Sequence, residues 1–268
     1  MNQFLITCFR SGQPQALSNV PVNAPSIIYV SRGTKRLIWR EQTINVEKEH
    51  LLVVPPRQSL SFVNLPEQGK YTAWQFCFPF RLPTYISQHL IEAFHSTNDT
   101  SELQHHSGSS PLLHVNDDLM MAIKSAIAAK EGDRAESLQL HYMYGILVAL
   151  AQSYDISSMF LPHDESILER VIQILSWSPA QEWRAEDVAS TLAMSESTFR
   201  RKLKEQNASF RDLLIEVRLS HGLNLLQLRH LDLYDVAAMC GYISYDRFAR
   251  QFKKRFSLSP NEYRKTCL

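Results

Sequence analysis

Hydrophobic and polar positions change with a short period along the first third of the chain. Runs rich in β-branched and aromatic residues follow one another between residues 25 and 82: "SIIYV", "RLIWREQTINV", "HLLVVPP", "SLSFVNL" and "YTAWQFCF". Turn-forming stretches ("SRGTK", a Pro-Pro pair and "PEQGK") separate these runs, which is typical of short strands joined by tight connections. Several strands at this spacing predict a small barrel or sandwich.

The pattern then changes to the period of helices. "TYISQHLIEAF" predicts a short helix, and the polar, aperiodic stretch 96–111 predicts a loop. Leu113, Met120 and Ile127 repeat every seven residues. This repeat predicts a helix over about 112–131.

The next helix, predicted over about 135–153, is apolar nearly all round. Such a helix is buried on more than one side. One side can face the β-rich layer, and the other can face a helix of the same chain or of a second subunit in a homodimer. The sequence leaves both arrangements open.

From there to its end the chain has the pattern of helices. "YDISSMFLPHDES" is predicted to be a linker, which divides the chain into an N-terminal domain (1–162) and a C-terminal domain (163–268). The expected fold class is α+β and multidomain: a β-rich domain with helices, then an all-α domain. In the C-terminal domain we expect helices over "ESILERVIQILSWSP" and at about 185–192, 195–205, 210–228, 233–239 and 244–255.

Two stretches of the C-terminal domain repeat one element. "AEDVASTLAMSESTFRRKLKE" (185–205) and "LYDVAAMCGYISYDRFARQFKK" (233–254) each contain a short helix with Val-Ala, a tight turn, a serine and a second helix with an aromatic residue. This order is the layout of a helix-turn-helix, present here twice. Ser195 and Ser244 are predicted to cap the second helices rather than to contact a ligand.

Helical spacing gives each second helix a buried and an exposed face. Phe199 and Leu203 are expected to point inward in the first unit, and Phe248 and Phe252 in the second. A major groove admits one α-helix, and arginine can make a bidentate contact with guanine. The exposed arginines are therefore expected on base edges, and the lysines and Arg255 near the helix ends on phosphates. The expected DNA-binding residues are Ser197, Arg200, Arg201, Lys204, Tyr245, Asp246, Ala249, Arg250, Lys253 and Lys254.

The helix between the two units sets their separation. At about 1.5 Å per residue, the predicted helix 210–228 is roughly 28 Å long, and one turn of DNA is about 34 Å. A rigid helix of that length can hold two recognition helices in successive major grooves of one duplex.

Charge and composition agree with this interpretation only in part. Residues 1–164 carry 12 Lys and Arg against 14 Asp and Glu, whereas residues 165–268 carry 16 against 13, so only the second domain favours an anionic partner. No apolar run approaches the roughly 18 to 20 residues that a membrane span needs, and we find no signal-peptide pattern. The four cysteines form no CxxC pair. A cytoplasmic protein with reduced thiols is expected.

These motifs make residues 165–264 resemble the C-terminal domain of AraC/XylS-type transcription regulators. The blocks that carry the resemblance are Ala189, Ser195 to Lys204, Arg218-Leu219, Val236 to Tyr242, Phe248 to Phe256, and Ser259, Pro260, Tyr263 and Arg264. "MSESTFRRKL" is similar to the form found in enterobacterial and vibrio-like virulence and stress regulators. The resemblance implies a transcription activator that binds double-stranded promoter DNA and acts on RNA polymerase.

Three positions depart from the family pattern. Asn207 and Ser257 stand where glycines are usual; asparagine also tolerates a left-handed backbone conformation, and the serine predicts a less tight turn. Asp246 is acidic on the face expected to contact bases. It can accept a hydrogen bond from cytosine N4 or cap the helix, and the sequence leaves both roles open.

The N-terminal domain is similar to the cupin-like β-barrel of the same family, which implies a sensor or dimerisation domain. For a small acidic effector, the candidate binding residues are Lys35, Arg57, Trp39 and Trp74. A metal-binding cupin needs a close His-x-His with further ligands, and the strands hold no such cluster, so we expect no metal and no cofactor. His105 and His106 lie in the polar loop.

Two alternatives to a regulator with an effector remain. The N-terminal domain can serve interactions alone, without a small molecule. DNA-repair alkyltransferases can also carry a double helix-turn-helix, but they need a cysteine of lowered pKa near basic groups. Cys8 and Cys77 lie in apolar runs, so no catalytic residue is expected.

Overall fold

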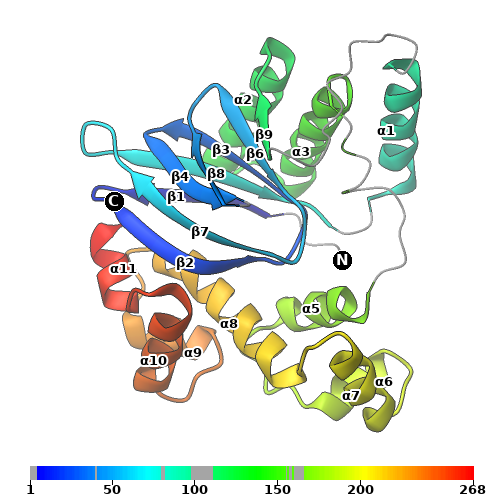
Figure 1. Ribbon diagram of the computed structural model, residues 1–268, viewed down its shortest axis with the longest axis vertical. Helices are drawn as coiled ribbons and strands as arrows, with labels where there is room; N and C mark the ends of the chain where they lie inside the picture. The colour runs from blue at the N-terminus through cyan, green and yellow to red at the C-terminus, as the bar shows by residue number, and fades with distance from the viewer. Residues whose placement is uncertain are drawn as a thin grey trace.

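A computed structural model gives the arrangement of the chain. It describes residues 5–39, 41–79, 82–97, 111–154, 156, 159 and 166–268. The N-terminal half contains two antiparallel sheets and helices, and the C-terminal half is helical (Figure 1). The predicted α+β class is therefore confirmed. The predicted linker and the boundary at 162 fall mostly outside the described residues, as do most of the 96–111 loop and the pair His105-His106.

The strands form two sheets that enclose a core, so of the two arrangements predicted from the strand pattern the structure has the sandwich, and the β-barrel implied by the family resemblance is not closed. Val30, Leu37, Leu52, Leu60 and Tyr71 come from both sheets and form the core between them. The five-stranded sheet has the order β1 (Leu5–Ser11), β8 (Tyr71–Cys77), β3 (Ser26–Arg32), β6 (His50–Val54), β9 (Leu112–His114). The four-stranded sheet has the order β2 (Gln15–Val22), β7 (Gln58–Leu65), β4 (Thr34–Trp39), β5 (Gln42–Val46). Strands β1 and β2 precede the range that the sequence pattern predicted.

The chain passes from one sheet to the other at Gly33. This residue joins β3 to β4 with a φ of 79°, a conformation that glycine adopts without the steric cost of a Cβ. A Cβ at this position would lie 2.5 Å from the carbonyl oxygen of Leu65. The turn predicted in "SRGTK" is thus present and requires glycine.

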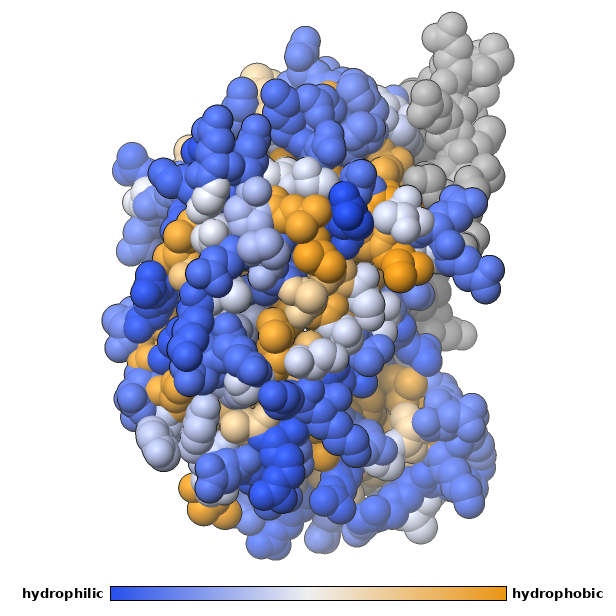
Figure 2. Space-filling view, turned by 60° about the vertical axis from the view of Figure 1, so that its left-hand side comes forward, coloured by the Kyte–Doolittle hydropathy of each residue, from blue (hydrophilic) through white to orange (hydrophobic). Residues whose placement is uncertain are grey.

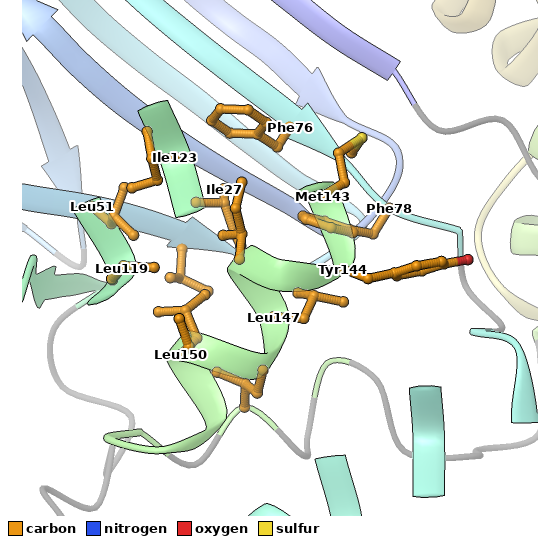
Figure 3. Close-up of a cluster of buried hydrophobic side chains, with 14 of the residues drawn as sticks. Ile27, Leu51, Phe76, Phe78, Leu119, Ile123, Met143, Tyr144, Leu147 and Leu150 are labelled. Atoms are coloured by element: carbon orange, nitrogen blue, oxygen red, sulfur yellow. The ribbon is translucent and has the colours of Figure 1, made fainter. Parts of the chain in front are cut away.

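In the described part of the N-terminal half, the longer helices are α1 (Thr84–Thr97), α2 (Asp117–Glu131) and α3 (Glu136–Ala151). The predicted start of the second helix at 112 is wrong, because residues 112–114 pair with β6 as β9 and Asn116 caps α2. Figure 3 shows the core in which side chains of α2 and α3 meet those of the five-stranded sheet. Since α3 packs against α1, α2 and this sheet, its apolar surface is explained within one chain.

The C-terminal helices follow the predicted order, with two differences. They are α5 (Ile167–Trp177), α6 (Ala185–Thr191), α7 (Glu196–Glu205), α8 (Phe210–Leu226), α9 (Leu233–Met239), α10 (Tyr245–Phe256) and α11 (Pro260–Thr266). Helix α8 ends two residues earlier than expected, and α11 was not predicted. Its signal was present in the sequence: Ser259 and Glu262 form a capping box around Pro260.

The two halves of the chain touch through β2. Leu17 of β2 belongs to the same core as the buried aromatic residues of α10 and α11. A backbone hydrogen bond also joins the two halves. The Gly12 N–H, just after β1, donates to the carbonyl oxygen of Thr266 at the end of α11 (2.8 Å). Within the part of the chain that the structure describes, no helix has the length and hydrophobicity to span a bilayer.

Candidate nucleic-acid interface and interdomain cavity

Helix α7 is fixed by its cap and by two buried side chains. The Ser195 hydroxyl accepts from the Thr198 N–H (3.3 Å), which confirms the predicted N-cap. Phe199 and Leu203 are buried in the core of the first unit. The opposite face carries exposed side chains, as predicted: Ser197, Arg200, Arg201 and Lys204.

Helix α10 repeats this arrangement in the second unit. Ser244 caps it by accepting from the Arg247 N–H, and Phe248, Phe252 and Phe256 are fully buried. Of the predicted contact residues, Asp246, Arg250, Lys253 and Lys254 are exposed, whereas Tyr245 and Ala249 are half-buried. The Tyr245 ring lies 5.2 Å from that of Tyr234.

Both exposed arginines of α7 are paired within their own helix. Arg200 reaches Glu196 and Arg201 reaches Glu205, each at 2.6 Å and with four-residue spacing. These groups are more than 40% exposed, and exposed pairs of this kind contribute only about 0.3–0.5 kcal/mol. A phosphate or a guanine edge can therefore replace either glutamate at small cost.

The basic residues of α10 differ in whether they form ion pairs with acidic side chains. Arg250 and Lys254 make no ion pair among the described residues, whereas Lys253 lies 3.5 Å from Glu262 of α11. Arg255, expected on a phosphate, is turned toward α8 and meets Glu216 at 3.1 Å in a half-buried pair. Burial raises the pKa of Glu216, and Arg255 opposes this shift. Arg255 thus joins α10 to α8.

Helix α8 is the scaffold of both units (Figure 1). Its 17 residues give a length of about 25 Å at about 1.5 Å per residue, slightly shorter than predicted. Arg218 of α8 donates to the carbonyl oxygens of Pro179 and Gln181, both at 2.9 Å. A Cβ on Gly241, in the turn of the second unit, would lie 2.7 Å from this guanidinium. The same side chain therefore fixes the entry to the first unit and limits the approach of the second.

The surface over the lower part of the molecule is mostly hydrophilic in Figure 2, where the helices of the C-terminal half lie. Three turns there use non-glycine residues with a left-handed backbone, one of them Ala193 (φ 54°) in the turn of the first unit. Asn207 has a φ of 53°, as expected, and Ser257 has a φ of 69°. The turn after α10 is thus made without glycine, and its expected loosening does not occur: Ser257 N–H donates to the Lys253 carbonyl oxygen at 2.9 Å.

A cavity of about 300 Å³ is lined by strands of both sheets and by helices α5 and α8. Lys35 of β4 lines it and is only 4% exposed. Its ammonium lies 3.2 Å from the centroid of the Phe62 ring and donates to Asn64 Oδ1 at 2.7 Å. Burial lowers the pKa of Lys35 well below its ordinary value. Among the described residues no carboxylate pairs with this ammonium, which is costly for a buried charge.

The polar contacts of Lys35 continue to the C-terminal helix. Asn64 Nδ2 donates to Gln15 Oε1 at 3.0 Å, and Gln15 Nε2 donates to Thr266 Oγ1 at 2.5 Å. This chain of side chains leads from the cavity through β7 and β2 to the end of α11. His221 of α8 also lines the cavity, and burial lowers its pKa.

The other effector candidates do not line this cavity. Arg57 is exposed in a turn, Trp39 packs at the edge of the core between the sheets, and Trp74 is buried beneath the helices of the N-terminal half. We missed Asn64 and Gln15. Period-two alternation could have found Asn64, because it shares a strand face with Leu60 and Phe62, and it likewise places Lys35 beside Leu37.

The cysteines do not have the character of nucleophiles. Burial raises the pKa of all four thiols: to about 11 for Cys8, Cys77 and Cys267, and to about 12 for Cys240. An alkyl-accepting cysteine needs the opposite shift. The described residues also contain no group of three or more His, Cys, Asp or Glu side chains that could hold a metal ion.

A family profile described as a helix-turn-helix domain matches residues 188–266, a range that begins within α6 and covers the rest of both units. This part of the chain is an AraC-type helix-turn-helix domain. The resemblance stated from the sequence motifs is therefore confirmed.

Two curated relatives are regulators from Escherichia coli. The chain is 29% identical to the urease operon transcriptional activator over 158 residues, which are 58% of this chain and 53% of that protein. It is 32% identical to the HTH-type transcriptional regulator YdeO of strain K12 over 100 residues, 37% of this chain and 39% of that protein. The matches thus span about half or less of the length of these relatives.

The fold of the whole chain is similar to that of a solved structure. ToxT from Vibrio cholerae, solved with an unsaturated fatty acid bound, aligns with a TM-score of 0.62 at 15% identity and covers 100% of this chain and 97% of that one. At this identity the likeness concerns the fold alone. Both proteins have a β-rich N-terminal domain followed by a helical domain with the helix-turn-helix units.

Proposed function

We propose that this protein is a sequence-specific DNA-binding transcription regulator of the activating kind. The observation that carries the proposal is the pair of capped helices, α7 and α10, whose exposed faces bear Arg200, Arg201 and Arg250. One rigid helix, α8, supports both. Its length of about 25 Å suits two successive major grooves on one side of a duplex.

Activation, the cytoplasm as the place of action, and contact with RNA polymerase are parts of the same proposal. The printed name of one relative, the urease operon transcriptional activator, supports activation. The likeness to ToxT from Vibrio cholerae and to the HTH-type transcriptional regulator GadX of Escherichia coli supports a role in virulence or stress.

Selection of duplexes from a random DNA library with the full chain tests the proposal. We expect an enriched consensus with two half-sites about one helical turn apart. A doubly substituted protein, Arg200→Ala with Arg250→Ala, serves as the control and should enrich no consensus. Failure of the wild-type chain to enrich any sequence over the library would reject sequence-specific binding.

The cavity supports a second part of the proposal: a small molecule with an anionic group and an apolar body. Lys35 supplies a buried amino group that lacks a carboxylate partner among the described residues and that an anionic ligand would hold in its charged form. Phe62 and Leu223 supply apolar walls. Ligand sites between domains commonly combine apolar walls with a few polar groups. ToxT has been solved with an unsaturated fatty acid and with a naphthalenyl-butenoic acid, two molecules of this chemical class.

Native mass spectrometry of the purified full chain tests this second part, and the same spectrum reports whether the chain forms the homodimer that the sequence left open. We expect a bound acid that Lys35→Met no longer retains. An empty wild-type protein that also fails to bind added oleate would favour the alternative of a regulator without an effector. Leu223→Met is a matched control, since it changes an apolar wall and keeps the ammonium.

A further inference from the structure

The turn of the second helix-turn-helix unit contains one residue more than that of the first. In the first unit, the Met194 N–H donates to the Ala189 carbonyl oxygen at 3.0 Å, and the next residue, Ser195, already caps α7. The turn therefore leads straight into the cap. No residue stands between its closing hydrogen bond and the recognition helix.

In the second unit, the equivalent bond runs from the Tyr242 N–H to the Ala237 carbonyl oxygen at 2.9 Å. The cap of α10 is Ser244. Ile243 is inserted between them and has no counterpart in the first unit. The inserted position lies directly before the N-terminus of the second recognition helix.

Folding does not explain the isoleucine at this position. Its relative exposure is 103%, the highest among the exposed large apolar side chains in the part of the chain that the structure describes. A side chain this exposed gains nothing from the hydrophobic effect in the free protein. A polar residue would serve the turn equally well.

The inserted side chain is nevertheless held in a defined place. Tyr242 before it is 8% exposed, and its hydroxyl donates to Gln251 Oε1 of α10 at 2.7 Å. Ser244 after it caps α10. With both neighbours anchored, the backbone of Ile243 has little freedom, and its side chain projects from the end of the helix.

The position and the surrounding charge identify what covers this side chain. The N-terminal part of a recognition helix contacts base edges in the major groove, and Arg247, Arg250 and Lys254 on α10 are exposed and complementary to a polyanion. In that groove the apolar group that a base offers is the thymine 5-methyl. We propose that Ile243 contacts a thymine methyl in the half-site bound by α10 and selects for that base.

This inference rests on the proposed DNA-binding function and adds a specificity residue to it. The methyl and the isoleucine would bury each other, whereas arginine and lysine contacts on α10 supply most of the affinity. Burying one methyl-sized group corresponds to about fourfold in affinity. The expected signature is therefore a small, thymine-dependent effect.

The test is a cycle of one protein change and one base change. The duplex enriched by the wild-type chain is resynthesised with deoxyuridine in place of each thymine in turn, which removes only the 5-methyl. The dissociation constants of full-length wild type and Ile243→Ala are measured on each duplex. Ile38→Ala is the matched control, since Ile38 is also exposed (66%) but lies on β4.

We expect one thymine in the half-site of α10 whose replacement weakens wild-type binding about fourfold and leaves Ile243→Ala unaffected. Ile38→Ala should respond as the wild type does. If every replacement affects wild type and Ile243→Ala by the same factor, the contact does not exist and the inference is overturned. Absence of any enriched duplex with wild type would instead reject the proposed function, so the two failures are distinguishable.

Discussion

The contrast between Arg250 and Arg200 gives the sharpest test of the DNA-binding faces. Arg250 has no ion-pair partner among the described residues, whereas Arg200 is held by Glu196 at 2.6 Å. A bidentate contact with guanine contributes about 1–3 kcal/mol of discrimination, which is roughly 5-fold to 150-fold in affinity. Arg250→Ala should lose this whole amount on the specific duplex.

Arg200→Ala should lose less. In the wild type, binding must first release the pair with Glu196, which offsets about 0.3–0.5 kcal/mol, or about twofold in affinity. The same reasoning predicts that Glu196→Gln alone raises affinity by up to about twofold, because the arginine is then free. The structure thus fixes both the order of the two alanine variants and the sign of the glutamine variant.

Fluorescence anisotropy with the enriched duplex and a scrambled duplex, at several salt concentrations, measures these effects. Loss of a base contact lowers affinity for the enriched duplex only. Loss of one phosphate contact lowers affinity for both and makes the salt slope less steep by about 0.9, which is the expected result for Lys254→Ala. Arg36→Ala, an exposed arginine on β4, is the control. If Arg250→Ala weakens both duplexes by the same factor, Arg250 contacts phosphate and the assignment of the face is wrong.

Three further predictions concern stability. Ser257→Gly should raise the free energy of unfolding by about 1 kcal/mol, because the left-handed φ of 69° strains serine but not glycine; denaturant titration checks this, and a loss of stability would contradict it. Gly33→Ala should destabilise by several kcal/mol, since its Cβ would meet the Leu65 carbonyl oxygen at 2.5 Å; an unchanged unfolding midpoint would show that the turn is not strained. Burial lowers the pKa of Lys35, so the folded state binds this proton less well than the unfolded chain does. The contribution of Lys35 to the free energy of unfolding is therefore fully present above the ordinary pKa of 10.5. It is lost as the pH falls through the pKa of the folded state. Unfolding measured between pH 7 and pH 10 should therefore show stability rising with pH, and Lys35→Met should remove that part of the rise.

Apart from α11, the sequence by itself determined the elements of the C-terminal domain, and it also determined the exposed faces of the recognition helices. These features depend on contacts between residues three to four positions apart, such as the burial of Phe199 with Leu203 and the caps at Ser195 and Ser244. Local periodicity and capping report such contacts directly. The repeat was visible for the same reason, since each unit is a local structure.

The tertiary structure alone decided how distant segments meet. Pairing of β1 and β2 with β8 and β7 joins residues about 40 to 70 positions apart, so a short-range pattern could not distinguish two sheets from a closed barrel. The place of Lys35 in a cavity against α8, and the polar chain from it to Thr266, likewise depend on the docking of one half of the molecule on the other. Likewise, the pairing of Arg255 with Glu216 became visible only when α10 was packed against α8. The physical reason is common to all three: burial and charge pairing between distant residues depend on three-dimensional packing, which the local order of side chains does not encode.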